Sequence, residues 1–187
     1  MGINLQKGQK IDLTKGNSTI KKLLVGLGWD PTVSGNFDCD ASVIVLDNDG
    51  KLEETIYFGN KKSKNNSIIH NGDNLTGFGD GDDEVITVDI KNLSAATNKL
   101  IFVVNIYKSD ERNQHFGMVK NAYIRIINEE SKEELAKFNL SDDFSGKTAL
   151  IVGEIYKYNN EWKFNAIGNG TNDKSIKELA SNIQGRI

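Results

Sequence analysis

The sequence predicts an all-β protein, a β-sandwich of two antiparallel-rich sheets with short helical turns and a C-terminal helix. Short runs rich in β-branched residues recur along the 187 residues, and segments rich in glycine, asparagine and aspartate separate them. Helical patterning is almost confined to the C-terminus. Proline occurs once, and no linker rich in proline, serine or glycine divides the chain, so we expect one domain over residues 1–187.

The predicted strands are short and rich in valine, isoleucine and leucine. In chain order they cover residues 22–29, 41–46, 84–90, 99–107, 121–127, 150–158 and 161–167. Several of them are apolar without strict alternation, which indicates strands that are buried on both faces or lie at the core of a sandwich.

Two connections between these strands have the chemistry of hairpin turns. They are residues 47–50 (Asp-Asn-Asp-Gly) and 158–161 (Tyr-Asn-Asn-Glu). The first also resembles the beginning of an EF-hand loop, but the glutamate needed at position twelve is replaced by Phe58, so a plain turn is expected.

Two segments have helical patterning. Residues 92–97 suit one or two helical turns, and residues 173–183 suit a longer helix. The apolar residues of that longer helix share one face: Ile176, Leu179, Ala180 and Ile183.

Composition argues against several classes of protein. The net charge of −3 and the isoelectric point near 5.5 argue against a general binder of nucleic acid or acidic membranes. A single cysteine, Cys39, excludes an internal disulfide and a zinc site built from several thiolates. The N-terminus lacks the apolar stretch of a secretory signal and no run is apolar enough to span a membrane, so we expect a cytoplasmic protein.

The segment 71–84 is an acidic, glycine-rich loop (Asn-Gly-Asp-Asn-Leu-Thr-Gly-Phe-Gly-Asp-Gly-Asp-Asp-Glu). Its five carboxylates are Asp73, Asp80, Asp82, Asp83 and Glu84. Glycine lets the backbone turn tightly, so that oxygen atoms can converge on a cation that takes about six to eight oxygen ligands, as calcium does. The alternative is a solvated acidic loop without a ligand. Removing these five charges from the net charge of −3 leaves +2, so the acidity is local, which fits a metal site.

Further ligands are expected from other parts of the chain. Asp38 and Asp40 lie two residues apart at the beginning of a predicted strand, so both side chains project from one face. With the loop they make seven carboxylates, enough for two adjacent calcium ions, and the alternative is a solvated pair. Neutral oxygens can come from Asn74 and Thr76. Of the last two acidic residues of the loop, one should point inward, and we favour Asp83 over Glu84 as a ligand.

No recognisable set of catalytic acid, base and nucleophile occurs in the sequence, so we do not expect an enzyme. His70 adjoins the acidic loop, but no nucleophile accompanies it, and we expect a structural or exposed histidine. We expect the same of His115. The alternative function is a calcium-dependent binder of small molecules or anions, or a hydrolase, that uses Arg112, Gln114 and His115.

The acidic loop, over residues 72–84, resembles the signature of the TerD family of tellurite-resistance and general stress proteins. Similar segments occur at residues 5–8, 26–29, 37–41, 112–117, 121–125, 134–136 and 161–164. The resemblance therefore covers about residues 2–170, and residues 171–187 form a less typical extension with helical patterning.

The resemblance implies a bacterial, cytoplasmic, calcium-binding β-sandwich in which two adjacent Ca²⁺ ions lie among loops. It implies no established enzymatic activity, and links the chain to resistance against tellurite, chemical damage and toxic agents. The metal-binding role carries over to Asp38, Asp40 and the matching positions of residues 73–84. Phe78 departs from the family, which often has an acidic residue there, so one site should be weaker. We expect action through interactions, with other stress and tellurite-resistance proteins as partners.

Overall fold

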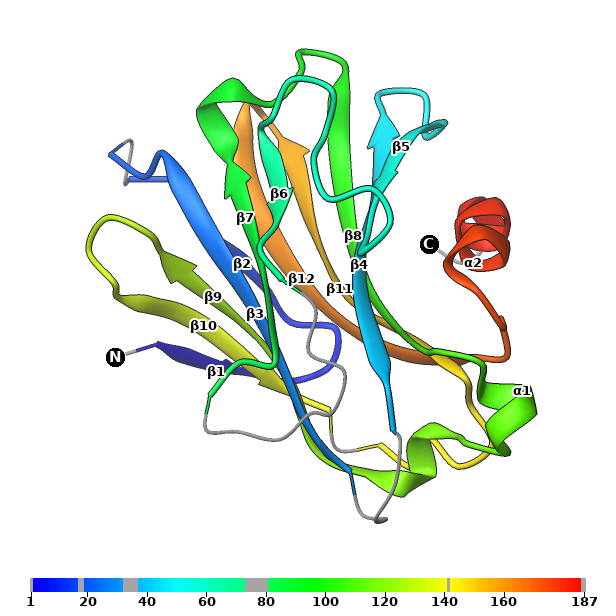
Figure 1. Cartoon of the computed structure of the whole chain (residues 1–187). Helices are drawn as coiled ribbons and strands as arrows, with labels where there is room; N and C mark the ends of the chain where they lie inside the picture. The colour runs from blue at the N-terminus through cyan, green and yellow to red at the C-terminus, as the bar shows by residue number, and fades with distance from the viewer. Residues whose placement is uncertain (1, 17–18, 32–36, 73–80, 141, 186–187) are drawn as a thin grey trace.

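The computed structural model describes residues 2–16, 19–31, 37–72, 81–140 and 142–185. Within these ranges, two six-stranded sheets pack face to face as a β-sandwich (Figure 1). The all-β prediction is confirmed. None of the described helices is long and apolar enough to cross a membrane.

The first sheet, called sheet A, contains the strand into which the acidic loop leads. Its strands, in spatial order, are β1 (Ile3–Leu5), β10 (Glu134–Asn139), β9 (Val119–Asn128), β3 (Lys22–Pro31), β7 (Glu84–Asp89) and β6 (Ile68–His70). Neighbouring strands are antiparallel except for β1 and β10, which are parallel.

The second sheet, called sheet B, is antiparallel throughout. Its strands, in spatial order, are β2 (Lys10–Asp12), β12 (Glu161–Thr171), β11 (Ala149–Tyr158), β8 (Thr97–Ile106), β4 (Cys39–Asp47) and β5 (Leu52–Ile56). The described helices are short: η1 (Ile90–Asn92), α1 (Ser109–Arg112), η2 (Phe116–Met118), α2 (Ile176–Asn182) and η3 (Ile183–Gly185).

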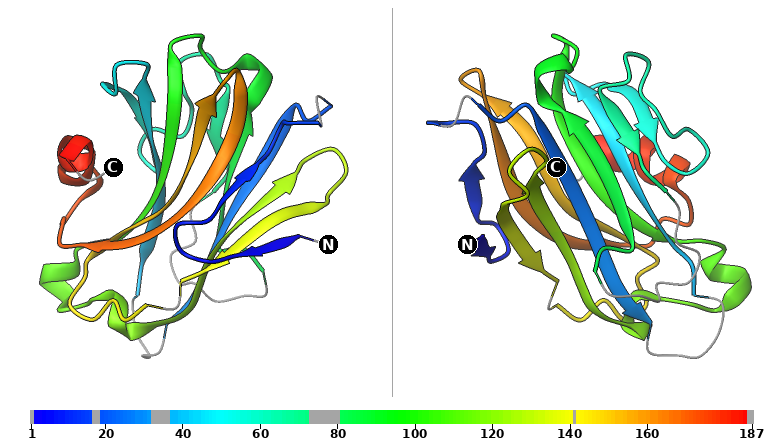
Figure 2. Two further views of the ribbon diagram at one scale, coloured as in Figure 1. Left: turned by 180° about the vertical axis from the view of Figure 1, so that it is seen from behind. Right: turned by 60° about the vertical axis from the view of Figure 1, so that its left-hand side comes forward.

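The N-terminal segment connects the two sheets. β1 pairs with β10 at one edge of sheet A, and β2 pairs with β12 at the edge of sheet B. Figure 2 shows this segment passing along one side of the sandwich. The first twelve residues therefore protect one edge of each sheet.

The buried apolar side chains of the strands form two clusters. The larger one lies between the sheets, where alternate residues of β3, such as Leu23, Val25 and Leu27, face sheet B. The smaller one lies on the outer face of sheet B, where Ile44 and Ile101 pack with residues of α2 (Figures 1 and 2). β4 is thus buried on both faces, as its continuous apolar run predicts. The predicted C-terminal helix and its apolar face are confirmed.

The longer strands agree with the predicted runs, which correspond to β3, β4, β7, β8, β9, β11 and β12. The strands outside those runs are β1, β2, β5, β6 and β10, which have only three to six residues. The helical turn expected over residues 92–97 lies slightly earlier, at Ile90–Asn92, and a hydrogen-bonded turn follows at residues 94–97.

Both predicted hairpin turns are present. Gly50 has a φ of +74°, and the Asp47 carboxylate accepts hydrogen bonds from the amides of Asp49 and Lys51. Asn159 and Asn160 both have positive φ, at +52° and +62°, as a two-residue hairpin turn of type I′ requires.

Candidate metal centre

Five of the nine predicted calcium ligands lie in the described part of the chain: Asp38, Asp40, Asp82, Asp83 and Glu84. The other four, Asp73, Asn74, Thr76 and Asp80, lie outside the described residues, as does Phe78. The five described side chains come from the beginning of β4 and from the segment that leads into β7.

Asp38 and Asp40 are carboxylates with little exposure, at 9 % and 4 %. Asp40 is paired with Asn105 of β8, and its neighbours in β4 face the main core, so its side chain lies on the outer face of sheet B. Asp38 precedes the strand, and its Oδ2 lies 3.9 Å from Nη1 of Arg112. Two carboxylates buried this close together are costly without compensating positive charge. A bound cation would supply such charge.

The residue between them, Cys39, is fully buried and points into the main core. Burial raises the pKa of its thiol well above the usual value, and the nearby carboxylates of Asp40 and Asp38 raise it further. The thiol therefore stays protonated and is unsuited to binding a metal. Oxygen atoms are the remaining donors, and oxygen donors fit a hard cation such as calcium.

Glu84, at the beginning of β7, points between the sheets. Its Oε2 accepts a hydrogen bond of 2.6 Å from the Ala41 amide and lies 3.4 Å from Nε2 of His70. The same His70 nitrogen lies 3.2 Å from the Ala41 carbonyl oxygen. β5 pairs with β4 only from Val43 onward, so the Ala41 peptide lies at an open edge of sheet B. Two residues of sheet A therefore satisfy this peptide, and His70 is a buried, hydrogen-bonded histidine.

Asp83 is held against the end of β3. Its Oδ2 accepts a hydrogen bond of 2.8 Å from the Trp29 amide, and its own amide donates to the Leu27 carbonyl at 2.9 Å. Partial burial raises the pKa of the Asp83 carboxyl, the hydrogen bond from Trp29 opposes this, and the charges of Asp30 and Asp82 raise it again. Of the last two acidic residues of the loop, Glu84 rather than Asp83 points between the sheets.

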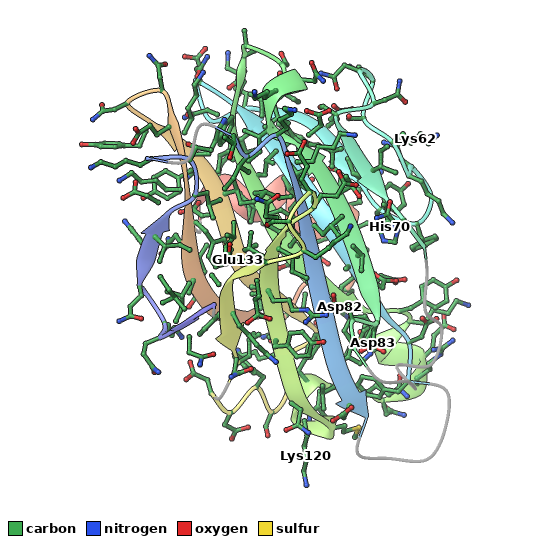
Figure 3. All side chains as sticks on the ribbon, turned by 90° about the vertical axis from the view of Figure 1, so that its left-hand side faces the viewer. Lys62, His70, Asp82, Asp83, Lys120 and Glu133 are labelled. Carbon is green, nitrogen blue, oxygen red and sulfur yellow. The ribbon has the colours of Figure 1, made fainter. Side chains whose placement is uncertain are left out.

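Asp82 lies on the outer face of sheet A (Figure 3). Arg125 of β9 donates from Nε to Oδ1 at 2.7 Å and from Nη2 to Oδ2 at 3.0 Å. The Tyr123 hydroxyl is 2.9 Å from Oδ1 and donates to the Gly81 carbonyl at 2.7 Å. The hydrogen bond to Asp82 is the largest cause of the raised pKa of Arg125. Calcium ligation by Asp82 stays a prediction, and a calcium ion there would compete with Arg125 for the carboxylate.

The described residues thus contain buried oxygen donors but no group of three acidic, histidine or cysteine side chains arranged around one point. Three members of the predicted ligand set lie on different sides: Asp40 outside sheet B, Glu84 between the sheets, and Asp82 outside sheet A. The donor chemistry fits calcium, and a complete shell would have to include oxygens of the loop outside the described residues.

Of the residues of the alternative function, Arg112 lies beside the beginning of β4. The Arg112 guanidinium stacks on the Tyr107 ring at 5.4 Å, next to Asp38. Nδ1 of His115 accepts a hydrogen bond from the Gly117 amide at 3.1 Å, and the Gln114 amide donates to the Ser109 carbonyl. The ring nitrogen of His115 that could serve as a base therefore caps η2.

A groove of about 1080 Å³ lies at the end of β3 and the beginning of β9. Its lining includes Asp83, Lys120, Tyr123, Arg125 and Lys137. Asp83 is the one residue among these five that the sequence predicts to have a role. Tyr123 and Arg125 of β9, which bond to Asp82, lie in the segment 121–125 that resembles the TerD family. This resemblance was the only sequence signal for them.

Comparisons with known proteins agree with this architecture. Residues 1–182 match the family model described as the TerD domain. Stress response protein SCP2 of Bacillus subtilis (strain 168) is 49 % identical over 197 residues, which cover 97 % of this chain and 98 % of that protein. Tellurium resistance protein TerD of Serratia marcescens is 41 % identical over 175 residues, 91 % of each chain. The crystal structure of SAV2460, a protein of unknown function, has a TM-score of 0.73 at 27 % identity and covers 90 % of this chain and 99 % of that one.

Proposed function

Because this chain belongs to the TerD family, we propose that it is a calcium-binding stress-response protein that acts through protein interactions and not by catalysis. The observation that carries this proposal is the burial of Asp38 and Asp40 beside one another at the beginning of β4. The relatives named above support the connection with general stress and tellurium resistance.

The ions would be held by oxygen atoms. We propose that two adjacent Ca²⁺ ions bind among Asp38, Asp40, Asp83, Glu84 and the loop residues Asp73, Asn74, Thr76 and Asp80. Asp82 belongs to the predicted set as well, although Arg125 competes for it. When bound, calcium would offset the mutual repulsion of these carboxylates and order the loop between β6 and β7.

Titration calorimetry of the metal-free protein tests the calcium site. We expect two Ca²⁺ ions per chain and much weaker binding of Mg²⁺, because Mg²⁺ needs compact octahedral geometry and gives up its water reluctantly. No heat on addition of Ca²⁺, or equal affinities for Ca²⁺ and Mg²⁺, would refute the proposal.

The interaction partners we propose are other stress and tellurite-resistance proteins, in the cytoplasm. Calcium-ordered loops would form a surface that the metal-free protein lacks. Affinity capture from a bacterial extract, once with Ca²⁺ and once with chelator, tests this. Partners retained equally under both conditions would show that calcium does not control the interaction.

A second candidate function is a calcium-dependent binder of anions or small molecules, or a hydrolase. Arg112 favours it, since its guanidinium lies 3.9 Å from Asp38, next to the proposed ions. Gln114 and His115 follow in the same segment. An Arg112→Gln variant that keeps calcium affinity but loses an anion-dependent thermal shift would support this candidate over the first.

A further inference from the structure

Two glycines create a shallow trough on the outer face of β3. Gly26 and Gly28 alternate with inward-facing Leu27, so their missing side chains leave the outside of the strand open. A Cβ at Gly26 would lie 2.1 Å from Oδ2 of Asp82, and one at Gly28 would lie 2.5 Å from the ring of Tyr123. Both contacts are too short for any other residue. The Asp82 carboxylate and the Tyr123 ring can therefore lie directly on the strand.

The register of the neighbouring strand supplies the donors. In β9, Arg125 is paired with Gly26 and Tyr123 with Gly28. Arg125 gives two hydrogen bonds to Asp82, and the single hydroxyl proton of Tyr123 is shared between Oδ1 of Asp82 and the Gly81 carbonyl oxygen. Arg125 is also supported from the far side by Glu134, with Nη1 3.5 Å from Oε2. The guanidinium thus lies between Glu134 and Asp82.

We propose that Asp82, Tyr123 and Arg125 form a latch that anchors the end of the acidic loop to sheet A, and that Asp82 is not a calcium ligand. The latch itself does not depend on calcium. Only its effect on the affinity for the ion rests on the proposed function. A bidentate guanidinium occupies both carboxylate oxygens. Calcium at the same oxygens would displace Arg125 or lie against its positive charge.

The latch fixes the path of the chain between the loop and β7. Asp82 is held outside sheet A, Asp83 is bonded to the backbone of β3 at Leu27 and Trp29, and Glu84 points between the sheets. Three successive acidic residues are therefore anchored on different partners. Because this end of the loop is held in place in advance, less conformational entropy is lost when calcium binds, which increases affinity. Tyr123 and Arg125 are positioning residues.

Two variants that preserve charge test the latch. Tyr123→Phe removes only the hydroxyl, and Arg125→Lys keeps the positive charge but loses the fork that binds both oxygens. We expect both to weaken calcium binding about fivefold, without changing the stoichiometry, and to accelerate hydrogen exchange at the Asp83 amide. The control is Tyr158→Phe, an exposed tyrosine at the β11–β12 turn, which should leave both quantities unchanged. Calcium binding as tight as, or tighter than, that of the unmodified protein in both variants would overturn the latch.

Asp82→Asn separates an anchor from a ligand in the absence of calcium. An anchor loses its pairing with Arg125, so the variant should melt several degrees lower in chelator. The control is Asp12→Asn, which removes a carboxylate that pairs with Lys163 at 2.8 Å on the surface and should change the melting temperature little. An unchanged or higher melting temperature for Asp82→Asn in chelator, with the loss of one ion, would show that Asp82 is a ligand.

The latch and the proposed function can fail separately. If the unmodified protein binds no calcium, the proposed function is refuted, while faster exchange at the Asp83 amide in Tyr123→Phe still supports the latch. If the protein binds calcium and that exchange is unchanged in both charge-preserving variants, the latch is refuted and the calcium site stands.

Discussion

Neighbouring acidic residues have different surroundings in this protein. Asp82 pairs with a guanidinium, Asp83 accepts from a backbone amide, and Glu84 accepts from an amide of the opposite sheet. The density of carboxylates and glycines indicates a calcium loop, and this stays a prediction. Their individual partners could not be predicted, because Arg125 lies 43 residues from Asp82 and meets it only through the pairing of β9 with β3.

Substitution of single carboxylates should separate ligands from bystanders. We expect Asp38→Asn, Asp40→Asn and Asp80→Asn each to weaken calcium binding at least about tenfold, because each removes a negative charge beside the ion. A tenfold change corresponds to about 1.4 kcal/mol of binding free energy. Calorimetry measures this. The controls are Asp47→Asn and Asp49→Asn in the β4–β5 turn, which should bind calcium normally. Asparagine at 47 keeps the oxygen that accepts the two turn hydrogen bonds. Equal weakening in the controls would place the site elsewhere.

Glu84 should matter for stability even without calcium. Glu84→Ala leaves the buried Ala41 amide without its acceptor, so we expect the free energy of unfolding in chelator to fall by about 2–3 kcal/mol. Glu84→Gln keeps an accepting oxygen and should lose less. Urea denaturation measures both. Glu111→Ala, at a side chain that is 67 % exposed, is the control and should change stability by less than about 0.5 kcal/mol. A loss no larger than that of the control would mean that the contact with Ala41 does not stabilise the fold.

Among the elements, β4 and α2 are closely connected. β4 carries core residues on one face and Ile44 and Leu46 on the other, and α2 covers this outer face. The continuous apolar run of β4 and the periodic apolar face of α2 were both readable in the sequence. Short edge strands were not, because three residues such as those of β6 give no detectable period. β6 becomes a strand through pairing with β7 on one side and a bridge between Ile69 and Lys62 on the other.

Weakening the contact of α2 should destabilise the fold and leave the metal centre intact. Leu179 is fully buried against sheet B, so Leu179→Ala should lower the free energy of unfolding by about 3 kcal/mol. Lys177→Ala, on the exposed side of the same helix, is the control. Thermal denaturation and calcium calorimetry measure the two effects. If Leu179→Ala melted like the control, α2 would not contribute to the core.

At the scale of the whole molecule, the two sheets are joined on opposite sides by different means. On one side the N-terminal segment pairs with both sheets, and on the other Glu84 and His70 bond to the open edge of β4. The sandwich, its layers and its terminal helix followed from hydrophobic patterning. These connections did not, because each joins residues that are distant in sequence, either through strands of three residues or through one or two polar side chains.

Removal of calcium should lower the stability of the whole protein, and the change should begin in the acidic loop. A ligand that binds only the folded protein stabilises it by about 2.7 kcal/mol at a hundred times its dissociation constant. Chelator should therefore lower the melting temperature by several degrees, and hydrogen exchange should increase first in residues 71–84. Calorimetry and exchange mass spectrometry measure these quantities. Identical melting and exchange with and without chelator would contradict calcium-dependent ordering.

The N-terminal segment also bears on self-association. Loss of its first twelve residues would uncover β10 and β12 together, and each would present unpaired backbone amides and carbonyls to solvent. A trimmed chain would then have two unpaired strand edges, one in each sheet. Each edge could pair with a strand of another molecule. Proteolytic trimming should thus make the protein more prone to associate through these two edges.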